Sequence, residues 1–166
     1  MLFRSKVRED DIYEFLQKNQ EKFYRVAYSY TRNKEDALDV IQDSVYKALI
    51  NVKTLKDKRL LKTWFYRILI NTSIDKIRNV KNEFVLFDEE NDSLSKDEIN
   101  VDVIDLYDAL DKLDEHQRIV IILRYFEDMK IEEISVILGC PKSTIKSRIY
   151  AGLKSLKVKM EGDGNE

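Results

Sequence analysis

Apolar residues recur at helical spacing along most of the chain. Their periodicity predicts an amphipathic helix over residues 10–30 and another over residues 34–52. Asn33 and Asp36 have the spacing of a helix N-cap and its third helical residue, so the second helix is expected to begin there. Its apolar residues form one stripe that we expect to face the core: Leu38, Ile41, Val45, Ala48 and Leu49.

A polar connector (KTLKDKR, residues 53–59) precedes a segment that is dense in apolar and aromatic residues, residues 60–79. We expect three or four helices that share one core and end near Lys81. From residue 82 to residue 100 the periodicity is lost, which predicts an acidic linker. Helical periodicity then returns, with one apolar face made of Val103, Leu106, Leu110 and Leu113.

The last part of the chain changes character at Gly139-Cys140-Pro141. Residues 131–138 (IEEISVIL) have the pattern of a short helix, and Gly139 suits the left-handed position that ends one. Pro141 is tolerated in the first turn of a following helix and would break it later. Two helices joined by such a turn predict a helix-turn-helix, although purely structural helix pairs share the pattern.

Composition supports an all-α fold class. Four glycines and one proline in 166 residues leave little material for hairpins. We therefore expect two small helical domains with a linker and a tail: residues 1–81, 82–100, 101–160 and 161–166. No run approaches the roughly 20 apolar residues of a membrane span, so we expect a cytoplasmic protein.

The chain shows none of the residue patterns that would mark an enzyme. It has one cysteine, which excludes an internal disulfide and a cysteine-cluster metal site. We find no nucleophile–base pair, glycine-rich phosphate loop or metal-ligand spacing. The sequence therefore predicts a protein that is not an enzyme and has no cofactor, metal or small-molecule ligand.

The formal net charge is only −2, but charge is unevenly distributed. Residues 53–81 hold nine Lys or Arg against two acids, and residues 140–160 hold six Lys or Arg and no acid. Between these basic segments, residues 88–115 hold twelve acids against two lysines. Two basic segments around an acidic one suggest two surfaces that contact a polyanion, although each could also be an ordinary solvated face.

The second basic segment coincides with the second helix of the predicted helix-turn-helix. In that unit the N-terminal residues of the second helix lie against base edges in the major groove. Here they combine short hydroxyl side chains with cations that suit phosphates and guanine: Lys142, Ser143, Thr144, Lys146, Ser147 and Arg148. A DNA-binding helix is therefore favoured over a structural one.

With these motifs in view, the chain resembles bacterial RNA polymerase sigma factors of the extracytoplasmic-function group, which is related to sigma-70. LDEHQRIVIILRYFEDMKIEEISVILGCPKSTIKSRI resembles region 4 of that family, DALDVIQDSVYKAL resembles region 2.2, and LKTWFYRILINTSIDKIR resembles regions 2.3–2.4. The segment FYRVAYSYTRNKEDALD is similar to the sigma-V-like group of low-GC Gram-positive bacteria. The resemblance covers residues 19–159 and implies a factor that directs promoter-specific transcription initiation.

The resemblance also implies how the chain binds its partners. Asp39, Gln42 and Asp43 match the region 2.2 motif that docks on the clamp helices of core RNA polymerase, whose flap is a further contact. Without the resemblance, an acidic helix face would be interpreted as merely solvated. Family members are usually held inactive by a membrane-anchored anti-sigma factor, so the resemblance implies such a partner as well.

For the −10 promoter element, Asn71 matches the family asparagine that, with the connector Leu55–Leu61, forms a pocket for a flipped-out base. Trapping an unstacked base offsets a few kcal/mol of unstacking. The basic residues nearby are expected to follow the backbone of the single strand: Lys56, Lys58, Arg59, Lys62 and Arg67. Trp64 is expected to be mainly structural.

The sequence departs from the family pattern at two places. Leu55 stands where many members have an aromatic residue, which puts the shape of the base pocket in doubt. After Ser147-Arg148-Ile149 the chain has Tyr150-Ala151-Gly152, where the family often has an arginine at the second position. Direct contact with −35 bases then rests more on Lys146, Ser147 and Tyr150, and Gly152 costs about 1 kcal/mol relative to Ala inside a helix.

Three other classes of protein remain as alternatives. A helix-turn-helix repressor or activator would need a dimer interface and has no use for the DxxQD stretch. A nucleic-acid-modifying enzyme would need a catalytic constellation. An adaptor that binds only proteins would not need two cationic helices.

Overall fold

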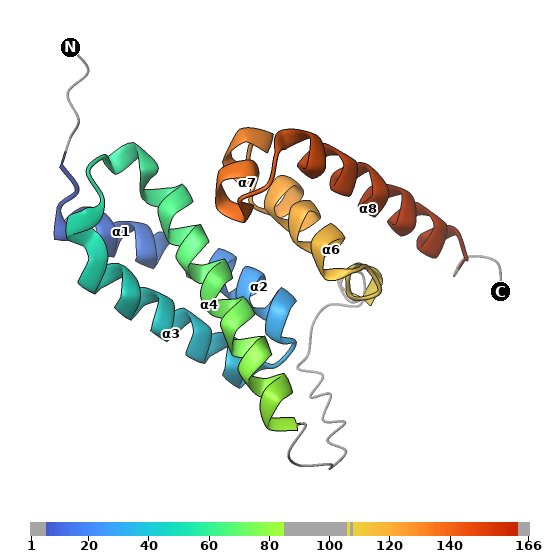
Figure 1. Cartoon of the computed structure of the whole chain (residues 1–166), viewed down its shortest axis with the longest axis horizontal. Helices are drawn as coiled ribbons and strands as arrows, with labels where there is room; N and C mark the ends of the chain where they lie inside the picture. The colour runs from blue at the N-terminus through green and yellow to red at the C-terminus, as the bar shows by residue number, and fades with distance from the viewer. Residues whose placement is uncertain (1–5, 85–105, 107, 163–166) are drawn as a thin grey trace.

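The computed structural model describes residues 6–84, 106 and 108–162 of the chain. Within these ranges the secondary structure is entirely helical, which confirms the predicted fold class (Figure 1). The elements are α1 (Glu9–Lys18), α2 (Gln20–Thr31), α3 (Lys34–Asn51), η1 (Val52–Thr54), η2 (Lys58–Leu60), α4 (Leu61–Phe84), α6 (Glu115–Ile121), the π-helical turn η3 (Ile122–Phe126), α7 (Ile131–Leu138) and α8 (Lys142–Gly162).

The first four helices form a bundle around an aromatic cluster. Phe23 of α2 packs against Phe65 and Tyr66 of α4, with ring centroids 4.5 and 5.5 Å apart. Phe15 of α1 lies 5.5 Å from Phe23. Aromatic pairs at these separations contribute about 0.5–1.5 kcal/mol each beyond the apolar area that they bury. The cluster therefore fixes the position of α4 against α1 and α2.

The helix predicted over residues 10–30 is two helices in the structure, because the chain breaks at Asn19. Asn19 has non-helical backbone angles (φ −116°, ψ 16°), and its side-chain amide donates a 2.7 Å hydrogen bond to the Phe15 carbonyl. Asparagine competes in this way for carbonyls that a continuing helix would use. The break allows Phe15 and Phe23 both to contact Phe65.

α3 begins as predicted, with Asn33 accepting a 3.0 Å hydrogen bond from the Asp36 amide. Of the predicted apolar stripe, Ala48 is buried and Ile41, Val45 and Leu49 are partly buried against the core, so only the exposed Leu38 departs from the prediction. The fully buried residues are mostly small, and they allow α3 to approach α2 and α4 closely: Ala37, Val40, Ser44 and Ala48. Leu38, Ile41 and Val45 also line a groove of about 550 Å³ between α1, α2 and α3.

The C-terminal helices pack on one another, with α6 and α7 both against α8. Asp114 caps α6 by accepting hydrogen bonds from the His116 and Gln117 amides. α7 ends at Gly139, whose φ of 65° and ψ of 31° give it the predicted left-handed conformation. Pro141 directly precedes α8, where its missing amide hydrogen costs no helical hydrogen bond. The predicted helix-turn-helix is therefore present.

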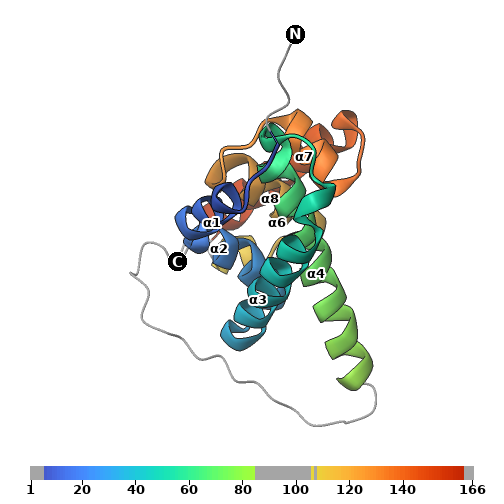
Figure 2. The same ribbon diagram turned by 90° about the vertical axis from the view of Figure 1, so that its left-hand side faces the viewer.

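The N-terminal and C-terminal bundles are in contact. α7 packs against α4, and α6 packs against α2 (Figure 1 and Figure 2). Among the described residues, ion pairs cross this contact, which we call the seam, between Arg25 and Glu127 and between Arg32 and Asp111. The sequence made no prediction about how the two halves are placed.

The domain limits predicted from sequence can be compared with the helices only in part. α4 continues to Phe84, beyond the predicted end at Lys81, and α8 continues to Gly162. Residues 85–100 of the predicted linker lie outside the described residues, as do 101–105, 107 and 163–166. Among the helices described, none is long and apolar enough to cross a membrane.

Gly152 gives a test of the packing between α8 and α6. A Cβ at this position would lie 2.7 Å from Ile121 Cδ1 and 3.2 Å from Ile121 Cγ1. We predict that Gly152→Ala gives no net stabilisation, because displacement of Ile121 offsets the gain of about 1 kcal/mol in helix propensity. In an Ile121→Val background, which removes Cδ1, the same substitution should be more favourable by about 1 kcal/mol. Urea denaturation of the four proteins measures this coupling, and equal effects in both backgrounds would contradict it.

Candidate interfaces on α3, α4 and α8

The outward face of α3 carries exposed polar side chains. Asp39, Gln42 and Asp43 all lie there and are all exposed. Lys76 of α4 approaches Asp39, with Nζ 3.5 Å from Oδ2. Partial burial lowers the pKa of Lys76, but the carboxylates of Asp36 and Asp39 outweigh this effect and hold that pKa above its ordinary value. Lys76 thus stays charged and partly neutralises Asp39, whereas Asp43 has no ion pair with any described residue.

Two large side chains that the sequence analysis did not assign continue this face. Tyr46 and Ile50 are 66% and 59% exposed. Because positions 39, 42, 43, 46 and 50 follow helical spacing, they share one side of α3. Exposed aromatic residues beside charges are typical anchors of protein–protein interfaces. The same spacing could have indicated both residues from the sequence alone.

A neighbouring side of α3 faces α4 across a cavity of about 330 Å³. Trp64 and Ile68 supply apolar walls, and the remaining lining residues are polar: Lys47, Asn51, Thr54, Asn71 and Thr72. Lys47 donates a 3.1 Å hydrogen bond from Nζ to the hydroxyl oxygen of Thr72, which joins the two helices across the cavity. The exposed Asn71 amide makes no hydrogen bond with any described residue. An aromatic wall beside the Asn71 amide, which has no hydrogen-bond partner among the described residues, is suited to hold a planar, polar ligand such as a nucleobase.

The structure changes which residues accompany Asn71. Leu55 is only 7% exposed and packs in the core, so it does not line the cavity. Its apolar side chain is buried where the connector turns back toward α4. Thr54, just before Leu55, lines the cavity, together with Lys47 and Asn51 from the end of α3. These residues escaped the sequence analysis because their proximity to Asn71 depends on how α3 packs against α4.

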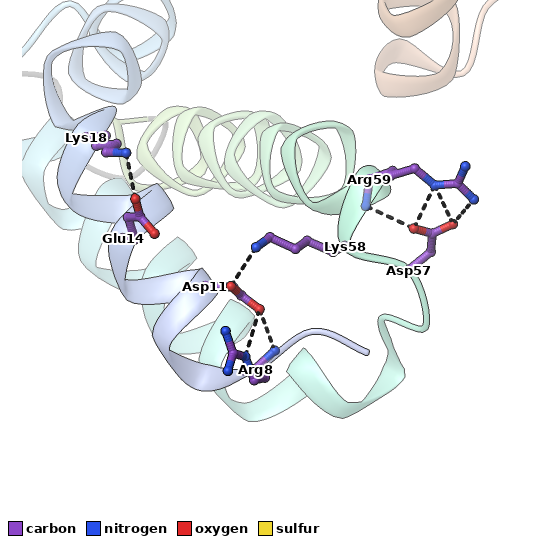
Figure 3. Close-up of polar contacts among 7 residues, drawn as sticks. All are labelled: Arg8, Asp11, Glu14, Lys18, Asp57, Lys58 and Arg59. Carbon is purple, nitrogen blue, oxygen red and sulfur yellow. Dashed lines mark hydrogen bonds and ion pairs between the residues drawn. The ribbon is translucent and has the colours of Figure 1, made fainter. Parts of the chain in front are cut away.

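Two of the five cations expected to follow a single strand are held within the chain (Figure 3). Lys58 Nζ lies 2.7 Å from Asp11 Oδ1, and the guanidinium of Arg59 donates two side-chain hydrogen bonds to Asp57 Oδ2, at 2.8 and 3.2 Å. The hydrogen bond and charge of Asp57 raise the pKa of Arg59. The first pair fastens the connector to α1, and the second lies within the connector itself. Lys56, Lys62 and Arg67 have no ion pair with any described residue.

α8 presents its candidate residues on one exposed side. Lys142, Ser143, Lys146, Ser147 and Tyr150 are exposed. Thr144 and Arg148 are half-buried, and Arg148 donates from Nη1 to the Cys140 sulfur at 3.4 Å. Arg148 therefore supports the turn before α8 as well as carrying charge. Among the described residues, no group of three or more His, Cys, Asp or Glu side chains could hold a metal ion.

Comparison with known families and proteins covers both bundles. The model of sigma-70 region 2 matches residues 15–83, and the model of sigma-70 region 4 matches residues 104–156. The chain is 43% identical over 143 residues to the RNA polymerase sigma factor SigV of Bacillus subtilis, with 86% of each protein covered. It is 30% identical over 154 residues to the ECF RNA polymerase sigma factor SigW of the same organism, covering 83% of this chain and 82% of SigW.

Two solved structures are similar over nearly the whole chain. The sigma factor RpoE of Bartonella quintana, solved in complex with the anti-sigma factor NepR, is 26% identical with a TM-score of 0.82, covering 92% of this chain and 98% of RpoE. CnrH, solved in complex with the cytosolic domain of CnrY, is 20% identical with a TM-score of 0.71, covering 94% of this chain and 91% of CnrH. Because CnrH is only 20% identical to this chain, its similarity supports the fold and not the function.

The ion pair that fastens the connector gives a pH prediction. The hydrogen bond from Lys58, and another from the Arg8 amide, hold the pKa of Asp11 below its ordinary value. The interaction therefore stabilises the fold above the unfolded pKa of about 3.9 and is lost as pH falls through the folded pKa. In thermal melts, Asp11→Asn should be less stable than wild type at pH 7, and the difference should shrink below about pH 4.

The matched control is Glu14→Gln on the same helix. Glu14 pairs with Lys18, but both side chains are more than 60% exposed, so its loss should have little effect on melting. A difference between wild type and Asp11→Asn that stays constant from pH 7 to pH 3 would contradict the assignment.

Proposed function

This chain belongs to the sigma-70 family of RNA polymerase sigma factors, in its extracytoplasmic-function group, and from that premise we propose how its surfaces divide the work of promoter-specific transcription initiation. The outward face of α3 binds core RNA polymerase. The cavity beside Asn71 holds a base of the melted −10 strand, and α8 contacts the −35 duplex. The observation that carries the proposal is that α3 has an unobstructed acidic face on one side and a polar cavity on another.

The docking surface on α3 is supported by exposure and charge. Asp43 and Gln42 have no partner among the described residues, so they can form charge-assisted hydrogen bonds with arginines of the clamp helices. Asp39 contributes less charge, because Lys76 already approaches it. The polymerase flap, a further contact in this family, would meet the C-terminal bundle.

Capture of a −10 base is supported by the composition of the cavity. The Trp64 and Ile68 walls suit the faces of a base, and the Asn71 amide can donate to and accept from a base edge. Lys56, Lys62 and Arg67 remain available for the backbone of the strand. Lys58 and Arg59 serve mainly to hold the connector, because Asp11 and Asp57 already bind them.

Contact with the −35 duplex is supported by the exposed side of α8. Lys146 and Ser147 are exposed side by side in sequence, Tyr150 is exposed about one turn further, and Lys142 and Ser143 lie at the N-terminal end that enters the groove. Thr144 and Arg148 are half-buried and contribute secondary contacts. Because α8 lacks an arginine at Ala151, its base preference differs from that of relatives that have one.

Regulation by an anti-sigma factor is part of the proposal. A similar sigma factor was solved in complex with the anti-sigma factor NepR, and CnrH was solved with the cytosolic domain of CnrY. We propose that a membrane-anchored anti-sigma factor holds this chain inactive in the cytoplasm until a signal releases it.

Run-off transcription with purified core polymerase tests the central role. Wild-type protein should give promoter-dependent transcripts, and Asp43→Arg should abolish them and should no longer co-purify with core. The introduced charge repels arginines on the partner helices, while the exposed position leaves the fold intact. Circular dichroism checks that the variant is folded.

The control is Glu9→Arg, an equal charge reversal at the exposed start of α1, away from the α3 face and from the C-terminal bundle. It should bind core as wild type does. Normal co-purification of Asp43→Arg would disprove the docking surface, and the absence of any wild-type-dependent transcript would disprove the function.

A second variant tests the cavity. Asn71→Ala removes the amide without changing the docking face, and a lost base contact costs about 1–3 kcal/mol. We expect roughly ten-fold or greater loss of promoter opening, measured by permanganate reactivity of melted thymines, with unchanged affinity for core. Asn79→Ala is the matched control, since Asn79 is exposed on the same helix but does not line the cavity. Equal promoter opening by both variants would remove Asn71 from the proposed site.

A further inference from the structure

One lysine of α4 is shared by two carboxylates of α3. The Nζ of Lys76 lies 3.4 Å from Asp36 Oδ1 and 3.5 Å from Asp39 Oδ2. Positions 36 and 39 are neighbours on the surface of a helix, so both side chains can reach the same cation. The ammonium group therefore pairs with one acid of the proposed docking surface, Asp39, and with one acid beside that surface, Asp36.

The three side chains differ in their access to water. Lys76 and Asp36 are 30% and 31% exposed, whereas Asp39 is 59% exposed. Partial burial acts to lower the pKa of Lys76, but the two carboxylates hold that pKa above its ordinary value, so the cation persists at neutral pH. Lys76 and Asp36 thus form the more enclosed pair, and Asp39 is the acid that a binding partner can reach.

A cation of a partner protein that approaches Asp39 also meets the charge of Lys76. Like charges a few ångströms apart repel one another appreciably even near the protein surface. An arginine of the polymerase clamp helices would therefore gain the attraction of Asp39 and lose part of that gain to the repulsion from Lys76. Asp43, which has no ion pair with any described residue, is not opposed in this way.

Asp36 determines how firmly Lys76 holds Asp39. With Asp36 present, the ammonium group keeps one carboxylate when Asp39 turns to a partner protein, so no half-buried cation is left alone. Without Asp36, Lys76 would depend on Asp39, and removing Asp39 would leave the cation unpaired. The arrangement makes Asp36 the fixed partner of Lys76 and Asp39 the exchangeable one.

We propose that Lys76 is a positioning residue that limits the affinity of this chain for core RNA polymerase by competing for Asp39, and that Asp36 keeps this competition weak. The inference rests on the proposed function, because it takes the outward face of α3 as the surface that binds core polymerase. It adds a residue of another helix, to which the sequence analysis gave no role, and assigns to it the strength of that contact.

The binding of full-length protein to immobilised core polymerase, measured by surface plasmon resonance without DNA, tests the proposal. Lys76→Met removes the charge and keeps a long apolar side chain in the half-buried position. It should bind roughly two- to ten-fold more tightly than wild type, and the gain should shrink as salt is raised from about 0.05 to about 0.5 M. Lys76→Arg keeps the charge and should stay close to wild type.

The variant Asp36→Asn should change the affinity in the opposite direction. It should weaken binding roughly two- to five-fold, because Lys76 then holds Asp39 more firmly. In a Lys76→Met background the same substitution should have little effect, because no cation is left to compete for Asp39. A general effect of charge would weaken binding equally in both backgrounds, which would contradict the proposal. Circular dichroism checks that each variant is folded.

The matched control is Glu35→Gln, which makes the same change of charge in the same turn of α3. Glu35 is exposed, and among the described residues Lys76 pairs with Asp36 and Asp39 but not with Glu35. This variant should bind core polymerase as wild type does. A loss equal to that of Asp36→Asn would show that only the total charge matters and would overturn the role of the shared lysine.

The remaining outcomes separate this inference from the proposed function. If Asp43→Arg fails to bind while Lys76→Met binds no more tightly than wild type, the role of Lys76 is refuted and the docking surface stands. If Lys76→Met binds more weakly, Lys76 supports the contact and does not limit it, which also refutes the inference. Normal binding by Asp43→Arg, or no binding by wild type, would refute the docking surface itself, and the role of Lys76 would fail with it.

Discussion

The packing of Phe23 against Phe65 and Tyr66 is the contact on which the other surfaces depend, because it fixes the rotation of α4. Around this helix, Phe65 faces the aromatic core, Trp64, Ile68 and Asn71 face the cavity at spacings of four and three residues, and Tyr66 reaches Glu127. Successive residues are about 100° apart on a helix, so a rotation by one position would remove all three arrangements at once. α4 is therefore a common support for the core, the cavity and the seam, and the bulky rings that hold it cannot be exchanged without affecting each of them.

Features governed by a few consecutive residues were predictable from the sequence. Asn33 caps α3 and Gly139 ends α7, as their neighbours along the chain indicated. In each case one side-chain or backbone preference acts over three or four residues, and no distant contact competes with it. The exposure of Asp39, Gln42 and Asp43 was also predictable, because these polar residues fall outside the apolar stripe of α3.

What the sequence could not provide depends on contacts between distant segments. The buried face of α3 uses Ala37, Ser44 and Ala48, since close approach of helices favours small residues over the large apolar ones that dominate a periodicity pattern. Leu55 belongs to the core and Lys47 to the cavity, because the path of the connector and the packing of α3 on α4 place them there. Lys58 and Arg59 are ordinary cations in the sequence. Only the fold brings Lys58 to Asp11, 47 positions away.

The carboxylates of Asp11 and Glu127 form similar ion pairs in different surroundings. Each is nearly or wholly buried and bound by a cation. Asp11 and Lys58 belong to one bundle with a shared apolar core, so breaking their contact exposes no new interface and the connector simply loosens. Glu127 meets Arg25 and Tyr66 across the seam, where the buried apolar residues of the two bundles belong to one continuous cluster, so its burial depends on the packing of both bundles. A buried charge contributes little net stability when its burial is permanent, because desolvation offsets the attraction.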